Sequence, residues 1–193
     1  MIKKERSRMS DLMSFSEIDG SGAVMVAAQR RVAMVTLKAD LSNKTTRAAL
    51  KMVLGTPVPA PRKISKGVAW MAPDELLIIV PNGETPDALC SRLQAEIKAP
   101  ALAVDVSDAR AVFTLKGNNA REVLAKGAPV DLSVDAFTLG DFRRTRLGQV
   151  AVAFWMEADD EITLVCFASL KQFMFDWLVN AAQKGSLPAY LNR

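Results

Sequence analysis

The stretch VAWMAPDELLIIV at residues 68–80 decides the fold, because it predicts two strands and the turn that joins them. Aliphatic and aromatic residues fill both ends, whereas Pro73 and Asp74 in the middle are typical of a tight turn. The stretch VAFWMEADDEITLV at residues 152–165 repeats this pattern, with a Trp-Met pair before an acidic turn and an aliphatic strand. The pattern of an amphipathic helix follows both stretches. The sequence therefore predicts two similar hairpin–helix units and suggests an internal duplication.

The segments around these hairpins predict further strands and helices. We expect strands at residues 32–37, 67–71, 75–80, 101–106, 111–115, 142–147, 150–156 and 161–167, and helices at 41–54, after Thr85, after Gly117 and after Ser169. Ser169 and Gln172 have the spacing of a capping box for the last helix. Its expected buried face contains Leu170, Phe173, Met174, Trp177, Leu178 and Ala181.

The order of these elements is β-α-β-β-α-β followed by β-α-β-β-β-α. This order predicts an α+β fold of two ferredoxin-like βαββαβ-type halves, of which the second is incomplete. We expect residues 1–22 to form a flexible N-terminal arm, residues 23–107 the first half and residues 108–193 the second half. The two halves are expected to pack as one compact unit.

The absence of histidine excludes several kinds of active site. Ser-His-Asp and Cys-His nucleophile systems, histidine metal sites and the usual proton shuttle near neutral pH all need that residue. Cys90 and Cys166 lie far apart in the chain and show no metal-ligand spacing, so we interpret both as small buried hydrophobic residues. An active site built from carboxylate, lysine or arginine side chains is still compatible with the sequence.

Charge and hydropathy argue against nucleic-acid and membrane partners and against export from the cell. The formal net charge is +4, but the basic residues are scattered and are not interleaved with aromatic residues, which argues against a nucleic-acid partner. The longest apolar run, residues 76–80, is far too short to span a bilayer, and the charged N-terminus lacks the apolar core of a signal peptide. We therefore expect a cytoplasmic protein without a membrane partner.

Several motifs, taken in order, resemble the gamma subunit of heterotetrameric sarcosine oxidase. They are WMAPDELLI at residues 70–78, DVSDAR at 105–110, the helix and loop at 117–132, Phe137 with Gly140, RTRLG at 144–148, Trp155, and Trp177 with Leu178. The similarity covers residues 65–180. The resemblance rests on the order and spacing of these motifs together.

The resemblance implies a non-catalytic subunit with a structural role, packed against the alpha subunit of a complex that also contains beta and delta subunits. Such a complex oxidatively demethylates sarcosine to glycine and hydrogen peroxide and passes the one-carbon unit to tetrahydrofolate. The resemblance further implies that FAD, FMN and NAD are held by the alpha and beta subunits and zinc by the delta subunit, with no cofactor on this chain. A related N-methyl amine is an alternative substrate of such a complex.

That family in turn is similar to the folate-binding domain of the glycine-cleavage T-protein, in which a strand aspartate contacts the folate. The corresponding residues 147–156 contain no carboxylate, and Asp108 stands where the T-protein pattern has a histidine. A stand-alone tetrahydrofolate-binding or one-carbon-transfer protein of the T-protein type is therefore the alternative function.

Two groups of acidic residues are candidates for a cation site or for acid–base catalysis. Asp159, Asp160 and Glu161 lack the spaced oxygen ligands and the glycine of a calcium loop, so we expect a solvated turn. Asp105 and Asp108 flank a bend between two strands. As a general acid and base they would need a pocket and separated pKa values, and we favour a local Asx-type turn.

The candidate contact residues are Arg144, Arg146 and Phe175. On an extended strand Arg144 and Arg146 share a face, where they could clamp the carboxylates of a partner or of a folate tail. The alternative is a solvated edge strand that its charges protect from further pairing. Phe175 lies outside the expected buried face of the last helix, which predicts either an exposed side chain or a contact with a partner subunit.

Overall fold

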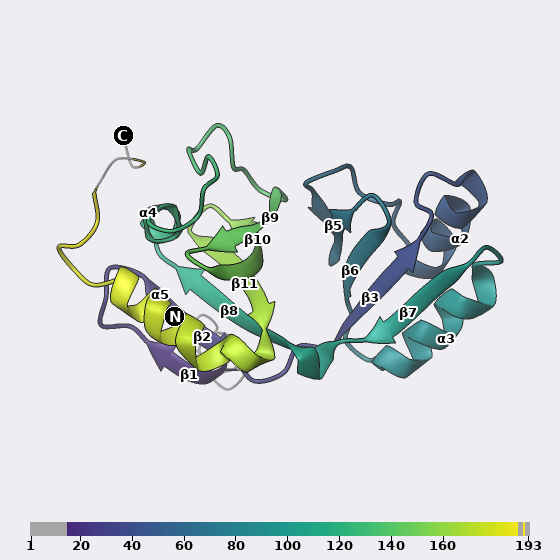
Figure 1. The fold of residues 1–193 in the computed structure, drawn as a ribbon, viewed down its shortest axis with the longest axis horizontal. Helices are drawn as coiled ribbons and strands as arrows, with labels where there is room; N and C mark the ends of the chain where they lie inside the picture. Colours follow the sequence, from purple (N-terminus) through teal and green to yellow (C-terminus); the bar gives the residue numbers. More distant parts are fainter. Residues whose placement is uncertain (1–14, 189–190, 192–193) are drawn as a thin grey trace, which may run out of the picture. The chain divides into compact units, whose positions relative to one another are not determined.

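The computed structural model describes residues 15–188 and residue 191. These residues form two units (Figure 1). Unit 1 contains residues 15–31, 110–139, 145–188 and 191, and unit 2 contains residues 32–109 and 140–144. The chain thus passes from unit 1 to unit 2 twice, at residues 32–109 and 140–144, and returns each time, which differs from the expected division into residues 23–107 and 108–193.

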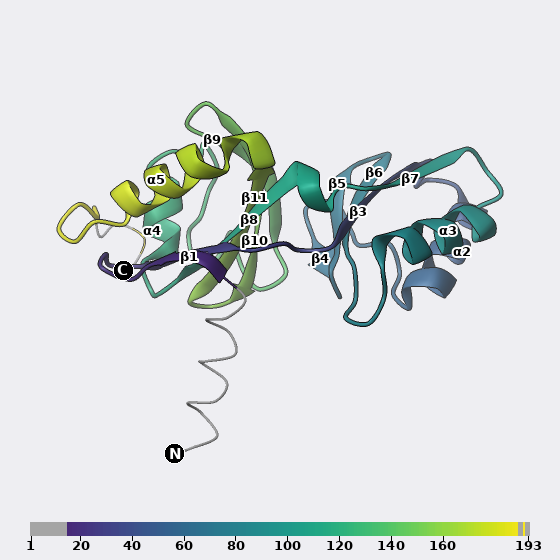
Figure 2. The same ribbon diagram turned by 90° about the horizontal axis from the view of Figure 1, so that it is seen from below.

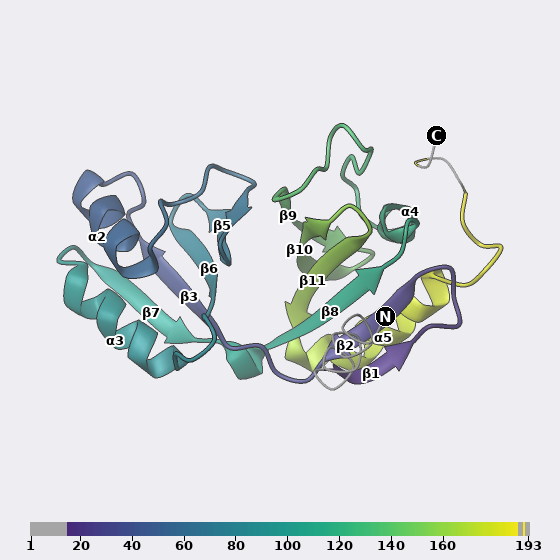
Figure 3. The same ribbon diagram turned by 180° about the vertical axis from the view of Figure 1, so that it is seen from behind.

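Unit 2 is a five-stranded antiparallel sheet with two helices on one face (Figure 1 and Figure 3). Its elements are β3 (Met34–Ala39), α2 (Lys44–Leu54), β4 (Ile64–Ser65), β5 (Val68–Ala72), β6 (Glu75–Ile79), α3 (Pro86–Glu96) and β7 (Ala101–Asp105). The strand order is β4-β5-β6-β3-β7. Apart from the two-residue β4, this is consistent with the predicted βαββαβ order, in which the last strand pairs with the first.

Local capping residues define both helices of unit 2. The Asn43 side chain accepts hydrogen bonds from the backbone N–H groups of Thr45 and Thr46, and Gly55 ends α2 with a φ of 65°. The hydroxyl of Thr85 accepts from the N–H of Ala88, and Pro86 begins α3. These ends agree with the sequence-based expectations because capping depends on residues that are neighbours in the chain.

Unit 1 is a six-stranded sheet that α4 and α5 cover (Figure 2). Its elements are β1 (Phe15–Asp19), β2 (Met25–Gln29), β8 (Arg110–Lys116), α4 (Ala120–Ala125), β9 (Phe142–Leu147), β10 (Val150–Ala158), β11 (Glu161–Phe167) and α5 (Lys171–Ala181). The first residues of β9, 142–144, are grouped with unit 2, although the strand belongs to this sheet. Short 3₁₀ turns occur in unit 2 at Ser107–Ala109 and in unit 1 at Ala168–Leu170. The strand order is β1-β2-β8-β11-β10-β9, so β2 occupies the position beside β8.

A strand near the N-terminus, β2, therefore supplies the strand that was missing from the predicted second half. β2 pairs with β8 in antiparallel register, with Met25 opposite Lys116 and Ala28 opposite Phe113. β1 pairs with β2, so the expected flexible arm at residues 1–22 is a strand from residue 15 to residue 19. Residues 1–14 lie outside the described residues.

Each unit has its own hydrophobic core. In unit 1, Val26, Phe113, Phe154 and Leu178 are fully buried in one cluster, and the Phe154 ring meets the Phe137 ring edge-on with centroids 5.6 Å apart. In unit 2, a second cluster forms between one face of the sheet and the helices, and it contains Val35, Leu37, Leu50, Leu76, Ile78, Leu89 and Leu93. Two separate cores explain why the chain divides into two units.

The last helix differs from the expectation in its start and in its buried face. A 3₁₀ turn precedes α5, and no side chain caps the helix, so the expected capping box of Ser169 and Gln172 is wrong. Gln172 instead donates through Nε2 to Asp176 Oδ1 at 2.9 Å. Phe175 is buried and Phe173 is 55% exposed, the reverse of the prediction. Within the described residues, the structure has no helix of the length and apolarity that a membrane span requires.

Candidate functional site

The predicted arginine pair lies on β9, the edge strand of the unit 1 sheet. Phe142 and Leu147 are buried at the two ends of this strand, whereas Arg144 and Arg146 are exposed. Their positions two residues apart place them on one face of the strand, as predicted. Arg143 points to the other face, is largely buried and lies 3.6 Å from Asp141.

Arg144 already has partners within the chain. Its Nη1 lies 3.4 Å from Glu75 Oε2 and 3.4 Å from the carbonyl oxygen of Met71. The Arg144 side chain is 52% exposed, so this ion pair is weak and solvent-screened. None of the described residues forms an ion pair or a hydrogen bond with the Arg146 side chain. Of the two arginines, Arg146 is thus the one whose guanidinium is fully available to an acidic partner.

Phe175 does not provide the exposed aromatic surface that the sequence predicted. Its side chain is 6% exposed and belongs to the core cluster of unit 1 together with Met174 and Leu178. The exposed aromatic residues nearby in the sequence are Phe167 and Phe173, with 47% and 55% of their surface accessible. The role of Phe175 as a direct partner contact is therefore corrected to a role in the core.

Asp105, at the bend before β8, stabilises the backbone. Asp105 Oδ1 accepts hydrogen bonds from the N–H of Ser107, at 2.8 Å, and from the Ser107 hydroxyl. The Ser107 oxygen in turn accepts the N–H of Met34 at 3.0 Å. This is the local Asx-type turn that the sequence favoured, and it ties the end of β7 to the start of β3.

The acidic turn between β10 and β11 behaves as a solvated turn. Glu161 Oε2 lies 2.9 Å from Lys116 Nζ on the neighbouring strand β8. The carboxylates of Asp159 and Asp160 line a cavity instead of forming a cation site. Residues 15–188 and 191 contain no group of three or more His, Cys, Asp or Glu side chains that could hold a metal ion.

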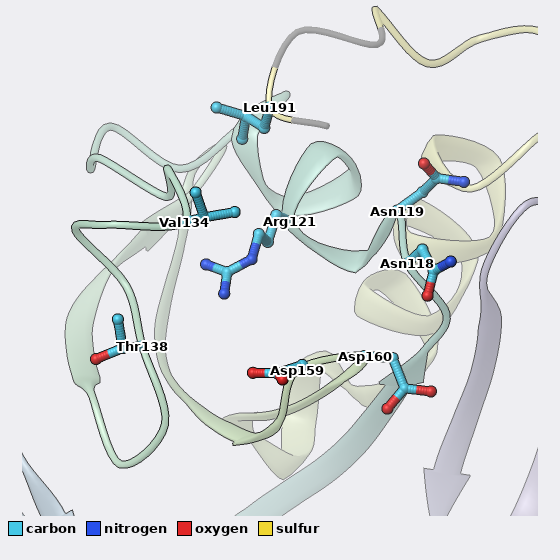
Figure 4. Close-up of a pocket in the computed structure, with 8 residues that line it drawn as sticks. All are labelled: Asn118, Asn119, Arg121, Val134, Thr138, Asp159, Asp160 and Leu191. Atoms are coloured by element: carbon cyan, nitrogen blue, oxygen red, sulfur yellow. The ribbon is translucent and has the colours of Figure 1, made fainter. Parts of the chain in front are cut away.

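This cavity belongs to unit 1 and has a volume of about 750 Å³ (Figure 4). Such a volume falls within the range of roughly 300–1,000 Å³ that is typical of small-molecule sites. The residues that line it are Asn118, Asn119, Arg121, Val134, Thr138, Asp159, Asp160 and Leu191. Figure 4 shows the Arg121 guanidinium pointing into the cavity from α4, with Asp159 across from it.

Arg121 is a candidate site residue that the sequence did not predict. It is 7% exposed, and its Nη1 donates to the carbonyl oxygens of Leu132, Ser133 and Phe137. Burial lowers the pKa of Arg121, and the negative charge of Asp159 opposes this change. The only signal in the sequence was an arginine beside the apolar face of a short helix, which is also typical of a solvated residue.

β10 contains most of residues 147–156, the stretch that the sequence analysis compared with the folate-contacting strand of the T-protein. It is buried over most of its length, and its first carboxylate is Glu157, next to its end. Glu157 Oε2 accepts a hydrogen bond from Trp155 Nε1 at 2.6 Å. The carboxylate of this strand is thus bound to a tryptophan of the same strand.

Comparisons with known proteins agree on one family. Residues 38–184 match the model of the "Sarcosine oxidase, gamma subunit family". The chain is 31% identical over 145 residues to the sarcosine oxidase subunit gamma of Corynebacterium sp. (strain P-1), covering 69% of this chain and 68% of the relative. It is 28% identical over 175 residues to the subunit gamma of Arthrobacter sp, covering 87% and 84% of the two chains.

A solved structure supports the same similarity in three dimensions. The chain superposes on a chain of the heterotetrameric sarcosine oxidase from Corynebacterium sp. U-96, in complex with pyrrole 2-carboxylate, with a TM-score of 0.75. The two chains are 27% identical, and the superposition covers 93% of each. The predicted α+β class is confirmed by this match, and the two antiparallel sheets belong to a fold already seen in that enzyme.

Proposed function

The chain belongs to the sarcosine oxidase gamma subunit family. We propose that it is the non-catalytic gamma subunit of a heterotetrameric sarcosine oxidase. Its role is structural: it packs against the alpha subunit and stabilises the assembled complex. The oxidative demethylation of sarcosine to glycine, hydrogen peroxide and methylene-tetrahydrofolate then takes place on the other subunits.

The observation that carries this proposal is the extent of the structural match. The superposition covers 93% of this chain and 93% of a chain of the heterotetrameric enzyme, so the two folds correspond over nearly their whole length. A protein of this family whose whole fold matches a subunit of the complex is best explained as the same subunit.

The chemistry of the described residues also supports a structural role. Asp105, the best candidate for acid–base chemistry, is hydrogen-bonded in a turn. Glu161 is paired with Lys116, and Arg144 is paired with Glu75. These charged groups stabilise strands and turns, so we assign the flavins, NAD, zinc and tetrahydrofolate of the complex to the alpha, beta and delta subunits.

Co-expression tests the proposal. The chain is produced with a tag together with the products of its neighbouring genes, which we expect to include a flavin oxidase chain and a small zinc-binding chain. We expect all four chains to co-purify in equal amounts and to form hydrogen peroxide when sarcosine is added. Omitting this chain should lower the yield and the thermal stability of the complex. The proposal is wrong if the remaining chains assemble and turn over equally well without it.

The alternative is a stand-alone tetrahydrofolate-binding protein of the T-protein type. The bond between Glu157 and Trp155 argues against it, because the carboxylate of β10 is already used within the strand. Calorimetric titration of the purified chain with tetrahydrofolate separates the two functions. Micromolar binding by the lone chain would favour the alternative, and no saturable binding would favour the structural subunit.

A further inference from the structure

The cavity of unit 1 contains two opposite charges that do not pair with each other. Arg121 and Asp159 both line it, and Figure 4 shows the carboxylate of Asp159 on the opposite side of the cavity from the guanidinium. None of the described residues forms an ion pair or a hydrogen bond with the Asp159 side chain. A cation and an anion thus face the same space, each with its charge available to a ligand.

The Arg121 guanidinium is held in place before any ligand arrives. Its Nη1 donates to three main-chain carbonyls of the loop between α4 and β9, and the guanidinium carbon lies 5.7 Å from the centre of the Phe137 ring. The described residues provide no partner for Nε and Nη2. A fixed guanidinium with two unused donors suits a carboxylate, because less side-chain freedom is lost when the ligand binds.

The opposite wall of the cavity suits an ammonium group. Asp159 lies in the turn between β10 and β11, where its side chain is exposed. In the view of Figure 4 Asp159 and Asp160 lie below Arg121, and Asn118 lies above Asp160. Carboxylates and an amide oxygen are the hydrogen-bond acceptors that a primary or secondary ammonium group requires.

The arrangement of charges selects the class of ligand. A simple anion would meet the carboxylates of Asp159 and Asp160, and a simple cation would meet Arg121, so each would experience repulsion. A zwitterion can place its anionic group at Arg121 and its cationic group at the carboxylates of Asp159 and Asp160. The remaining lining includes the apolar side chains of Val134 and Leu191, which both lie above Arg121 in the view of Figure 4.

We propose that this cavity binds the zwitterion of an α-amino acid with an apolar side chain. The ligand carboxylate contacts Arg121, its ammonium group contacts Asp159, and its side chain lies against Val134 and Leu191. The residues that line this cavity do not include the arginines of β9.

Isothermal titration of the full chain with L-leucine tests the proposal. The matched ligands are 4-methylpentanoate, which lacks the ammonium group, and 3-methylbutylamine, which lacks the carboxylate. We expect leucine to bind roughly tenfold or more tightly than either analogue, because each analogue leaves one charge of the cavity without a partner. Glycine should bind more weakly than leucine, because it has no side chain to bury. Equal affinity for leucine and both analogues, or no saturable heat at millimolar leucine, would overturn the proposal.

A pair of variants locates the binding. Asp159→Asn should weaken leucine binding by roughly tenfold while leaving the affinity for 4-methylpentanoate unchanged or increased. Asp135→Asn is the matched control, because Asp135 is an exposed acidic residue of the loop that Arg121 holds and does not line the cavity. Arg121 is unsuitable for this comparison because its removal would also release the loop. An Asp159→Asn variant that binds leucine as tightly as the wild-type chain would contradict the proposal.

Discussion

The backbone N–H of Ala23 donates to the carbonyl oxygen of Ala182 at 2.8 Å, which joins the segment before β2 to the end of α5. In a βαββαβ unit the strand that follows the second helix pairs with the first strand. In unit 1 none of the described residues after α5 forms a strand, and β2 takes this position beside β8. The contact between Ala23 and Ala182 marks where a strand from the beginning of the chain replaces one that would follow α5.

Gly22 is the residue that allows this contact. A Cβ atom at residue 22 would lie 2.5 Å from the carbonyl oxygen of Ala182, closer than real Cβ atoms approach backbone. Gly22→Ala should therefore lower the free energy of unfolding by about 1–3 kcal/mol, the usual cost of overpacking. Gly20→Ala is the control, because a Cβ there meets nothing within 4 Å. Its unfolding free energy should stay the same or rise by less than about 1 kcal/mol. Urea unfolding measures both, and equal effects would contradict this role of Gly22.

The two phenylalanines of α5 should differ strongly when they are truncated. Phe175→Ala should lower the free energy of unfolding by about 3–5 kcal/mol, because it opens a cavity in the core of unit 1. Phe173→Ala should change it by less than about 0.5 kcal/mol, because that side chain is 55% exposed. Thermal unfolding with circular dichroism checks both. If Phe175→Ala does not fold, Phe175→Leu provides a smaller loss in the same direction.

The cysteines should differ in their reactivity. Burial raises the pKa of Cys166 to about 11, although the charge of Arg110 opposes this effect. At pH 8 roughly a thousandth of this thiol is then the reactive thiolate. Burial, with Asp105 and Asp87, also raises the pKa of Cys90, but that side chain is only partly buried. Iodoacetamide should therefore label Cys90 first and Cys166 only after unfolding, as mass spectrometry of tryptic peptides would show.

The same pKa change predicts how stability depends on pH. The native state holds the proton of Cys166 more tightly than the unfolded state, so the stabilisation is complete below the ordinary value of 9.0. It is lost as the pH rises from 9.0 to about 11. Cys166→Ser should flatten the decline in the unfolding midpoint over this range. A decline of the same slope in the variant would show that other groups cause it.

Reversal of the charges on β9 tests whether this strand contacts a partner subunit. Arg144→Glu with Arg146→Glu should reduce co-purification with the other subunits if acidic groups face the pair, and the reduction should be largest at low salt. Arg47→Glu with Lys51→Glu on α2 is the matched control, since both residues are exposed and basic. Arg144→Glu also places a second carboxylate near Glu75, whose side chain is only 11% exposed, so it should lower the stability of the chain more than the loss of a surface ion pair would.

Arg146→Glu alone separates recognition from stability, because the Arg146 side chain has no partner among the described residues. We expect it to retain the melting temperature of the wild-type chain and to lose part of the binding. Complete assembly of both charge-reversal variants at low salt would remove β9 from the interface.

Most helices and hairpins could be predicted because their signals are local. Asn43 and Gly55 delimit α2, Thr85 and Pro86 begin α3, and the turn at Pro73 and Asp74 joins β5 to β6. Such signals act between residues a few positions apart, and they need no knowledge of the rest of the fold.

The candidate site could be predicted only in part. The alternation of a strand placed Arg144 and Arg146 on one face, but the pairing of Arg144 with Glu75 joins residues distant in the sequence. Arg121 gave no distinctive signal, because its surroundings come from the loop between α4 and β9 and from the turn that holds Asp159. A cavity is a property of packing, and local patterns do not define it.

The sequence by itself determined the α+β class, the two hairpin–helix units and, through the order of its motifs, the family. Only the tertiary structure decided that β2 belongs beside β8, that Phe175 instead of Phe173 is buried, and that Arg121 faces Asp159 across a cavity. The physical reason is the range of the interactions. Capping and strand alternation act along the chain, whereas the pairing of β2, the orientation of α5 and the lining of the cavity depend on contacts between residues far apart in sequence.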